Sequence, residues 1–457
     1  MRIRIPAAFS AIAVASMFAV GCSDSYFEGP RLSSNPNQPS SAKPENQFVG
    51  FQAFAFYSLT GDLNRLISLW NQQMAGTGRQ WAGYDQYAVT ENDFTFGSFY
   101  TQGGLVDIRG VQEKVADDKL YLGIAQTWEA LIMDLASDTW GDIPYSEAVT
   151  DVVHPKLDKQ LDVHNALLAL LDQAITNMNA GGTGPAALDL IYGGDKDSWV
   201  AAAHTLKARM YMHLAELDAS NYAKALAETD AGIASPAGDF TTYQSATTGE
   251  ANHWYQFRIQ RGTDISAGKF LVDLMKTRSD PRLTAYFEPG SDANGQIIGA
   301  PPGQEFDGTQ AWLSAVRGSP DFRQPVLTFA ENQMIRAEAQ YQTGAPGAAL
   351  ATLNAYRGSV GLGPKAAVGA VLLQAIMEEK YVALFQNTEV WNDYRRTCYP
   401  NLAPASGSFI PARLVYGTDE RRANPNIPSP SQQPKRNQLD PATPTAIDGS
   451  ACLGTGT

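Results

Sequence analysis

The sequence Asp138-Thr139-Trp140-Gly141-Asp142-Ile143-Pro144-Tyr145-Ser146-Glu147-Ala148 carries a clear signal for the end of a helix. Glycine at position 141 supplies the left-handed residue that often ends a helix, and Pro144 prevents the helix from resuming. Trp140 and Tyr145 flank the turn, and we expect them to hold it against the core. The residues before this motif are therefore predicted to form a helix that stops within it.

Apolar residues before this stop recur at spacings of three and four over residues 119–139, as they do on one face of a helix. The same pattern predicts helices over 163–178 and 199–217, and a final helix from about 371 to 394. The chain is therefore expected to be mainly α-helical.

Some of these helices occur in pairs. A short turn at 218–221 follows the helix over 199–217 and leads into a second helix. A turn at 344–347 likewise joins an alanine-rich helix that closes at Tyr341 to another that begins at Ala348. Small residues let paired helices approach closely, and hairpins of this length resemble tetratricopeptide units.

Two regions lack this periodicity. Residues 235–321 are rich in Gly, Pro, Thr and Asp, and the last 59 residues, 399–457, hold nine prolines. Long loops on a rigid frame commonly carry function. We expect a single domain over 47–457, in which a frame of helix hairpins supports a loop-rich ligand or partner face.

Composition excludes some classes of function. The chain has 457 residues, a net charge of −13 and an ordinary share of hydrophobic residues, 44%. Nucleic-acid binding depends on Lys and Arg contacts to phosphate, and this acidic chain offers no basic surface for it. Beyond the first residues, no apolar run approaches the roughly 20 residues that a membrane-spanning helix needs.

The first residues are typical of an export signal. Arg2 and Arg4 precede an apolar stretch over 5–20, which ends in Ala19-Val20-Gly21-Cys22. The small residues before Cys22 resemble the bacterial lipobox, in which the cysteine is acylated after cleavage. Residues 1–21 are then a lipoprotein signal peptide and 22–46, rich in Ser, Asn and Pro, a flexible tether. The alternative is an ordinary secretory signal in which Cys22 is incidental.

No motif for catalysis, metal binding or a cofactor is found. The five histidines, at 154, 164, 204, 213 and 253, include no pair at the four-residue spacing of a zinc helix. Glu378 and Glu379 on the last predicted helix are interpreted as a solvated face. A pair of catalytic carboxylates for glycoside hydrolysis stays open, since sequence separation says nothing about it. Cys398 and Cys452 are either two inert thiols or one bridge that holds the tail.

Two further motifs follow the first one. Residues 391–400, Trp-Asn-Asp-Tyr-Arg-Arg-Thr-Cys-Tyr-Pro, again combine a helix end with a stop, and Asp280-Pro281-Arg282 lies between. In this order, and behind the lipobox, the motifs resemble the SusD/RagB family of outer-membrane nutrient-binding lipoproteins, although Cys398 replaces the usual glycine. The signature residues, interpreted as structural, are Trp140, Gly141, Asp142, Pro144, Tyr145, Asp280, Arg282, Trp391, Arg395 and Arg396.

This resemblance implies a SusD-like fold and a location at the outer membrane, lipid-anchored and exposed on the cell surface. It implies a protein that is not an enzyme, binds an oligosaccharide or peptide, and acts as a lid on a SusC-like TonB-dependent transporter. Two alternatives remain: a helical-repeat scaffold lipoprotein that recruits envelope proteins, and an envelope glycoside hydrolase.

The ligand-binding residues are predicted separately, because the motifs end helices and do not locate a ligand. Sugar binding calls for exposed aromatic faces together with amides and charges. Aromatic and polar residues of this kind lie in segments without helical periodicity, although any single one of them is more often a half-buried side chain that covers the frame. The predicted set is Arg79, Trp81, Tyr84, Tyr87, Asn92, Trp254, Arg258 and Trp312.

Overall fold

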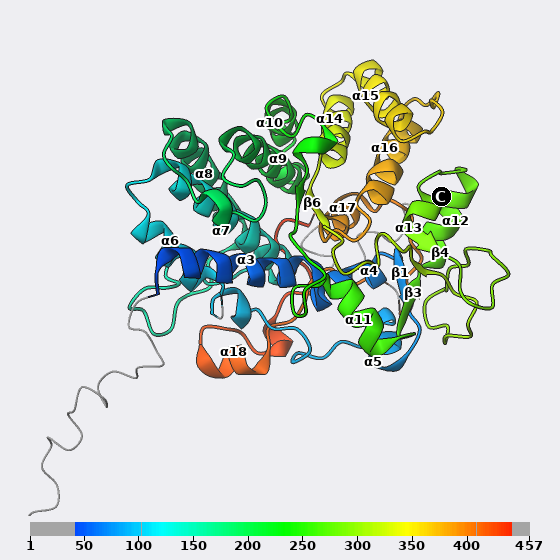
Figure 1. Cartoon of the computed structure of the whole chain (residues 1–457), viewed down its shortest axis with the longest axis horizontal. Coiled ribbons are helices and arrows are strands. Elements are labelled where there is room, and N and C mark those ends of the chain that lie inside the picture. Colours follow the sequence, from blue (N-terminus) through cyan, green and yellow to red (C-terminus); the bar gives the residue numbers. More distant parts are fainter. Residues whose placement is uncertain (1–41, 102, 408, 441–457) are drawn as a thin grey trace, which may run out of the picture.

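The structure, a computed structural model, describes residues 42–101, 103–407 and 409–440. Helices dominate these ranges, so the prediction of a mainly α fold is confirmed (Figure 1). None of the described helices combines the length and the apolar character that a membrane crossing requires. The predicted signal peptide, Cys22 and most of the predicted tether lie outside the described residues.

The chain runs through sixteen α-helices within the described ranges. The first eight are α3 (Pro44–Thr60), α4 (Asp62–Trp70), α5 (Arg79–Asp85), α6 (Leu105–Lys114), α7 (Lys119–Trp140), α8 (Gln160–Ala180), α9 (Lys196–Leu214) and α10 (Ser220–Thr229). The others are α11 (His253–Arg261), α12 (Lys269–Thr277), α13 (Leu283–Tyr286), α14 (Phe329–Gln342), α15 (Pro346–Ser359), α16 (Ala370–Ala383), α17 (Glu389–Thr397) and α18 (Thr418–Ala423).

The helix frame consists of neighbouring pairs, α7 with α8, α9 with α10 and α14 with α15, followed by α16 and α17. In Figure 1 these pairs form an arc above the horizontal helix α3. Side chains cap several of the helices at the N-terminus, where backbone N–H groups lack partners inside the helix. Asp118 accepts from the Tyr121 N–H, Asp195 from the Ser198 N–H, and Thr328 from that of Glu331.

Three small antiparallel sheets involve strands of the loop-rich part of the chain. They pair β1 (Met74–Gly76) with β3 (Ile265–Ala267), β2 (Phe240–Thr241) with β6 (Pro325–Leu327), and β4 (Phe287–Glu288) with β5 (Trp312–Leu313). In the first sheet Ala75 lies opposite Ser266. The first two sheets thereby fix segments far apart in sequence side by side.

The first signature motif ends its helix as predicted. Helix α7 stops at Trp140, and Gly141 follows with a φ of 82°. The Trp140 ring is buried and packs edge-on against Phe96 and Phe99. The Tyr145 hydroxyl donates to the Glu129 carboxylate at 3.0 Å. The turn is therefore fixed by core contacts on both sides.

The second signature motif is hydrogen-bonded to the first. Arg395 donates from Nη1 to the backbone oxygens of Asp138 and Ala412, each at 2.7 Å. Cys398 ends α17 in the left-handed conformation, with a φ of 58°, at the position where the family usually has glycine. The two motifs, about 250 residues apart, therefore form one buried junction.

The structure corrects three predictions about the elements. The predicted final helix over 371–394 is broken between α16 and α17, where Gln386 adopts a left-handed φ of 65° that a continuous helix does not allow. Residues 235–321 are more regular than predicted and hold α11, α12, α13 and four of the short strands. Glu379 is fully buried among arginines and is no solvated face.

The C-terminal region after α17 wraps back over the frame as far as residue 440. Leu414 donates its N–H to the Thr139 oxygen at 2.9 Å, and Asn437 Nδ2 donates to the Asp138 oxygen at 2.7 Å. Helix α18 lies along the opposite edge of the molecule from the helix arc (Figure 1). The prediction of a proline-rich tail without long helices fits the part that is described.

Candidate functional site

The surface near the junction of α3 and α4 is hollowed in three adjoining places. The central one, of about 610 Å³, lies between α3, α5 and α11, and we call it the α11 hollow. A second hollow of about 550 Å³ shares Tyr57 and Asp62 with it, and a third of about 890 Å³ shares His253. The α11 hollow is lined by Tyr57, Asp62, Arg65, Gln80, Trp81, His253, Gln256, Phe257, Gln260 and Arg261.

The floor of the α11 hollow is a cation held among aromatic rings. The Arg65 guanidinium lies 4.7 Å from the ring centre of Phe257, 5.7 Å from that of Trp81 and 5.8 Å from that of Trp254. It forms an ion pair with Asp62 one helical turn away and donates to the His253 oxygen at 3.0 Å. These contacts fix the floor, because cation–π contacts strengthen when water is excluded.

His253 lies at the point where two of the hollows meet. Its Nδ1 lies 2.7 Å from the Thr60 hydroxyl, and its ring packs edge-on against Tyr57 at 5.2 Å. Burial, reinforced by the charge of Arg65, lowers the pKa of His253 to about 4. The imidazole is therefore neutral at ordinary pH and serves the hollow as a hydrogen-bonding group without charge.

The rim of the α11 hollow carries an aromatic ring and several amides. Tyr57 is 47% exposed and offers a ring, Gln80 and Gln260 offer amide groups that both donate and accept, and Gln256, whose Nε2 donates to the Ala251 oxygen, offers its amide oxygen. Amides and hydroxyls beside an aromatic ring suit a neutral, hydroxyl-rich ligand. The arrangement fits binding of a polar, uncharged molecule.

Three of the predicted ligand residues are not exposed aromatic platforms. Trp81, Trp254 and Trp312 are 2%, 0% and 5% exposed. Trp81 packs edge-on against Phe257, and the Trp254 indole donates to Asn64 at 3.0 Å. Their burial corrects the expectation that these rings present open faces, since each large ring gains more by packing against the frame. Only Trp81 reaches the α11 hollow, as part of its wall.

The other predicted ligand residues lie around this region without lining the α11 hollow. Tyr84 packs edge-on behind Trp81, and the Tyr87 hydroxyl accepts the Ala405 N–H at 2.8 Å. Arg258 stacks on Trp312 at 4.9 Å. Asn92 accepts the Thr418 N–H at 3.2 Å, and Arg79 lies 3.6 Å from Asp264. The structure therefore does not gather the predicted set into one site.

Sequence reasoning missed most of the residues that line the α11 hollow. Tyr57 and Arg65 belong to helices α3 and α4, and Gln256 and Gln260 to helix α11. The two glutamines are four positions apart on one helix face, and this spacing was the available signal. It was hidden because α11 has only two buried residues, Trp254 and Phe257, and so shows no apolar stripe.

Two predictions concern cysteines. Cys22, the predicted lipid-attachment residue, lies outside the described residues. Cys398 is disulfide-bonded, whereas both other cysteines of the chain, Cys22 and Cys452, lie outside the described residues.

Comparison with solved structures identifies the fold. A chitin-binding protein superposes with a TM-score of 0.73 at 20% identity, over 87% of this chain and 100% of its own. A chitin-binding SusD homologue from Flavobacterium johnsoniae gives 0.72 at 20% identity, over 87% and 98%. A SusD/RagB family protein from Bacteroides thetaiotaomicron gives 0.69 at 21% identity, over 85% and 95%. Identities this low establish the fold alone.

Comparison of sequences identifies the family. No curated protein matches the chain significantly. The SusD-like family model, described as starch-binding and associating with the outer membrane, matches residues 36–417, which include the three signature motifs. This match spans most of the chain, and the solved structures with the same fold carry the same family name. The chain therefore belongs to the SusD-like family, as its motifs predicted.

Proposed function

We propose that this protein binds a neutral oligosaccharide at the cell surface and that the α11 hollow is its binding site. The observation that carries the proposal is the combination of an exposed Tyr57 ring with the amides of Gln80, Gln256 and Gln260 around one hollow. Family membership supports it, because the family is described as starch-binding and two structural neighbours are named chitin-binding. The adjoining hollows extend the surface along which a chain of sugars can lie.

The proposed mechanism is capture followed by delivery. The acylated Cys22 holds the protein at the outer membrane, and the tether lets the folded body sit as a lid on a SusC-like TonB-dependent transporter. The lipobox-like sequence supports the anchor, and two or more acyl chains give firm attachment. The family's description as associating with the outer membrane supports the location.

The proposal assigns no catalysis to the protein. Asp62, a carboxylate of the α11 hollow, is engaged by Arg65 in an ion pair, which leaves it a poor proton donor. A peptide ligand remains the second candidate, since the amides that bind hydroxyls also bind a peptide backbone. The scaffold and hydrolase alternatives predict other outcomes when the protein is titrated with oligosaccharides.

The experiment is calorimetric titration of the full chain with starch and chitin oligosaccharides. Tyr57→Ala and Gln260→Ala should each weaken binding at least about tenfold, the effect of losing about 1.4 kcal/mol of contact. Tyr341→Ala, in the frame helix α14, should leave affinity unchanged. Equal affinity in all variants would exclude the α11 hollow as the site, and shortened oligosaccharide products would favour the hydrolase.

The transporter role is tested independently. The native lipoprotein is purified from detergent-solubilised membranes, and the proteins that accompany it are identified. A TonB-dependent barrel in the purified complex supports delivery. An unmodified N-terminus in mass spectrometry, together with a soluble protein after cell fractionation, would contradict the lid mechanism.

A further inference from the structure

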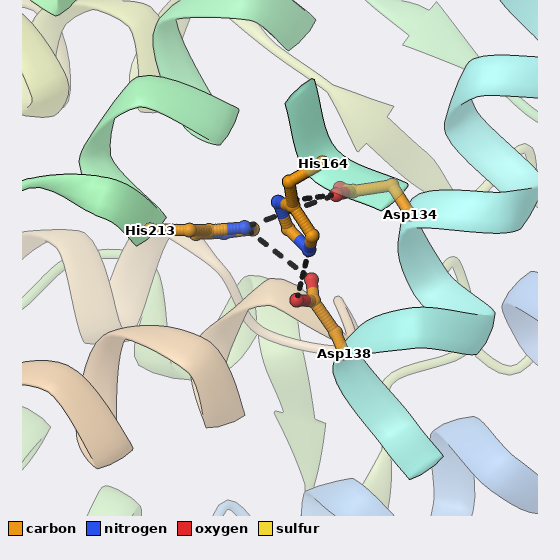
Figure 2. Close-up of side chains that lie close together, drawn as sticks. All are labelled: Asp134, Asp138, His164 and His213. Carbon is orange, nitrogen blue, oxygen red and sulfur yellow. Dashed lines mark ion pairs between the residues drawn. The ribbon is translucent and has the colours of Figure 1, made fainter. Parts of the chain in front are cut away.

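Two histidines and two aspartates meet in the core of the helix frame. Asp134 and Asp138 lie one turn apart on α7, His164 lies on α8 and His213 on α9 (Figure 2). Four ligand atoms, one from each residue, lie within 4.8 Å of one another. All four side chains are buried, and His164 is 0% exposed. We call these four residues the His–Asp cluster.

The polar atoms of the His–Asp cluster have too few hydrogen-bond partners. Among the described residues, neither ring nitrogen of His164 makes a hydrogen bond, and Nδ1 of His213 and Oδ1 of Asp134 make none either. Buried polar atoms are almost always paired, because an unpaired one loses its water without compensation. Several such atoms within 4.8 Å of one another in the core therefore suggest that a further group binds between them.

The separations inside the cluster fit a metal ion better than hydrogen bonds. His164 Nε2 lies 3.3 Å from Asp138 Oδ1, and His164 Nδ1 lies 3.6 Å from Asp134 Oδ1. His213 Nδ1 lies 3.4 Å from Asp138 Oδ2 and 3.9 Å from Asp134 Oδ1. Ligands at about 2.0–2.1 Å from a tetrahedral Zn²⁺ are about 3.3–3.4 Å apart. The contacts of Asp138 with His164 and His213 match these ligand separations, and those of Asp134 are longer. Because the two ring nitrogens of His164 point in different directions, one of them binds the ion and the other does not.

The outer contacts of His213 fix which nitrogen faces the cluster. Its Nε2 lies 2.9 Å from Glu389 Oε1, a carboxylate that accepts the ring proton. Nδ1 lies on the side of Asp134 and Asp138. In a ring bound to a metal ion through Nδ1, that nitrogen presents its lone pair to the ion, and Nε2 keeps the proton that it donates to Glu389. Metal-binding histidines commonly have this carboxylate behind the second nitrogen.

A second outer contact orients one of the aspartates. Asn392 Nδ2 donates to Asp138 Oδ2 at 2.6 Å and to Glu389 Oε2 at 2.9 Å. A narrow pocket, with room for about one water molecule, includes Asp138 and His213 in its lining and ends at Leu439 and Asp440. The cluster therefore has supporting contacts behind its ligands and a narrow space beside them.

We propose that the His–Asp cluster binds one divalent transition-metal ion, with Zn²⁺ preferred, and that the ion joins α7, α8 and α9 at the motif junction. Two imidazoles with two carboxylates favour Zn²⁺ over Ca²⁺ and Mg²⁺, which take oxygen ligands. Sequence analysis found no metal site because it sought two histidines on one helix. Here the fold brings together single histidines from two helices, and this arrangement leaves no local pattern.

The test is titration of the chelator-treated full chain with Zn²⁺, Ca²⁺ and Mg²⁺. We expect about one high-affinity Zn²⁺ per chain, a higher melting temperature when it binds, and no competition from Ca²⁺ or Mg²⁺. Co²⁺ in place of Zn²⁺ should give the intense visible absorption of a four-coordinate site. A folded wild-type chain that binds no Zn²⁺ would show that protons alone neutralise the cluster and would overturn the proposal.

Two matched variants locate the ion. His164→Gln removes a proposed ligand and should weaken Zn²⁺ binding at least about 100-fold. His204→Gln, on α9, changes a histidine that pairs with Glu228 at 2.6 Å outside the cluster, and it should bind Zn²⁺ like the wild type. Equal Zn²⁺ affinity in the two variants would overturn the assignment.

A milder variant keeps the test informative if His164→Gln fails to fold. Glu389→Gln retains the size of the side chain and a hydrogen-bond acceptor for His213, and it removes only the outer carboxylate charge. It should weaken Zn²⁺ binding about 10- to 100-fold while the Co²⁺ spectrum keeps its four-coordinate form. An unchanged affinity would contradict the proposed role of His213 as a ligand.

Discussion

The helix frame and the α11 hollow use polar side chains in opposite ways. In the frame, charged groups are buried in pairs, as where Arg396 meets Glu338 and Arg209 meets Glu331. Around the hollow, Arg65 is the buried cation, and two of the rim glutamines, Gln80 and Gln260, are exposed. In the frame, the polar groups therefore pair with one another and hold the helices together. Around the hollow, the exposed polar groups remain available to a ligand. Mutations in the two regions should separate stability from binding.

The largest effect is expected at Glu379, in the frame. Its carboxylate is fully buried and meets three arginines: Arg278, Arg282 at 2.6 Å and Arg357 at 2.9 Å. Glu379→Gln keeps the shape but leaves these cations without their shared anion, and it should lower the free energy of unfolding by about 3–5 kcal/mol. Chemical denaturation monitored by circular dichroism measures this loss.

The neighbouring residue provides the control. Glu378 is partly exposed, and its carboxylate accepts from Gln374 one turn earlier. Glu378→Gln should change the free energy of unfolding by less than about 0.5 kcal/mol, as is usual for surface positions. An equally small change in both variants would mean that the three arginines are solvated and that the buried network does not exist.

The two walls of the α11 hollow provide the next contrast. Trp81 is core and Tyr57 is exposed, although both line the hollow. Trp81→Leu should lower the free energy of unfolding by about 2–3 kcal/mol, because the smaller side chain leaves a cavity beside Phe257. The loss should be less than for full truncation to Ala, which would leave a larger cavity. Tyr57→Leu should cost less than about 0.5 kcal/mol and weaken oligosaccharide binding instead. Thermal melts and calorimetric titrations of both variants give the two readouts.

The opposite pattern would reverse the assignment of the two side chains. If Tyr57→Leu destabilised the fold and left binding intact, the exposed ring would belong to the frame. The α11 hollow would then lose its only exposed aromatic group among the described lining residues.

The frame could be predicted from sequence because its signals are local. The apolar spacing over 119–139 predicted α7, which spans Lys119–Trp140, and Gly141 and Pro144 marked its end. The family motifs were recognised for the same reason. Each combines a helix end with residues that hold the turn.

The hollow could not be predicted because its residues are brought together by tertiary contacts. Trp81 stands in a polar segment and was expected to be exposed, but Phe257, about 180 positions later, covers its ring. Burial of a single aromatic depends on such distant partners, and sequence spacing does not encode them. The same limit hid the His–Asp cluster, whose residues come from three helices.

Acid should lower the free energy of unfolding through protonation of His253, which lines the α11 hollow. Its pKa is about 4 in the folded chain and about 6.5 when unfolded, so the unfolded chain binds more protons between these values. The contribution of His253 to stability is therefore intact above about pH 6.5 and lost as the pH falls towards 4. At about pH 5 the loss should be about 1–2 kcal/mol relative to about pH 7.

Because other groups also titrate, the measurement compares the wild type with His253→Gln, which keeps a polar partner for Thr60. The free energy of unfolding of the wild type should fall more steeply with acid than that of the variant. Parallel curves would mean that the imidazole is charged, or solvated, in the folded chain. The α11 hollow would then carry a positive charge that the proposed neutral ligand does not require.

The smallest effect on stability is expected at Arg79, the most exposed charge in the predicted ligand set. Its side chain is 59% exposed and lies 3.6 Å from Asp264, a separation at which a surface ion pair contributes little. Arg79 also has a φ of 49°, so replacement by glycine relieves backbone strain while it removes the charge. Arg79→Gly should therefore change the free energy of unfolding by less than about 0.5 kcal/mol.

Oligosaccharide affinity in the same variant decides between the two sets of binding residues. An unchanged affinity supports the α11 hollow as defined by Tyr57 and the rim amides. A loss of tenfold or so, equal to that of Gln260→Ala, would extend the site to Arg79 and restore part of the sequence-based prediction.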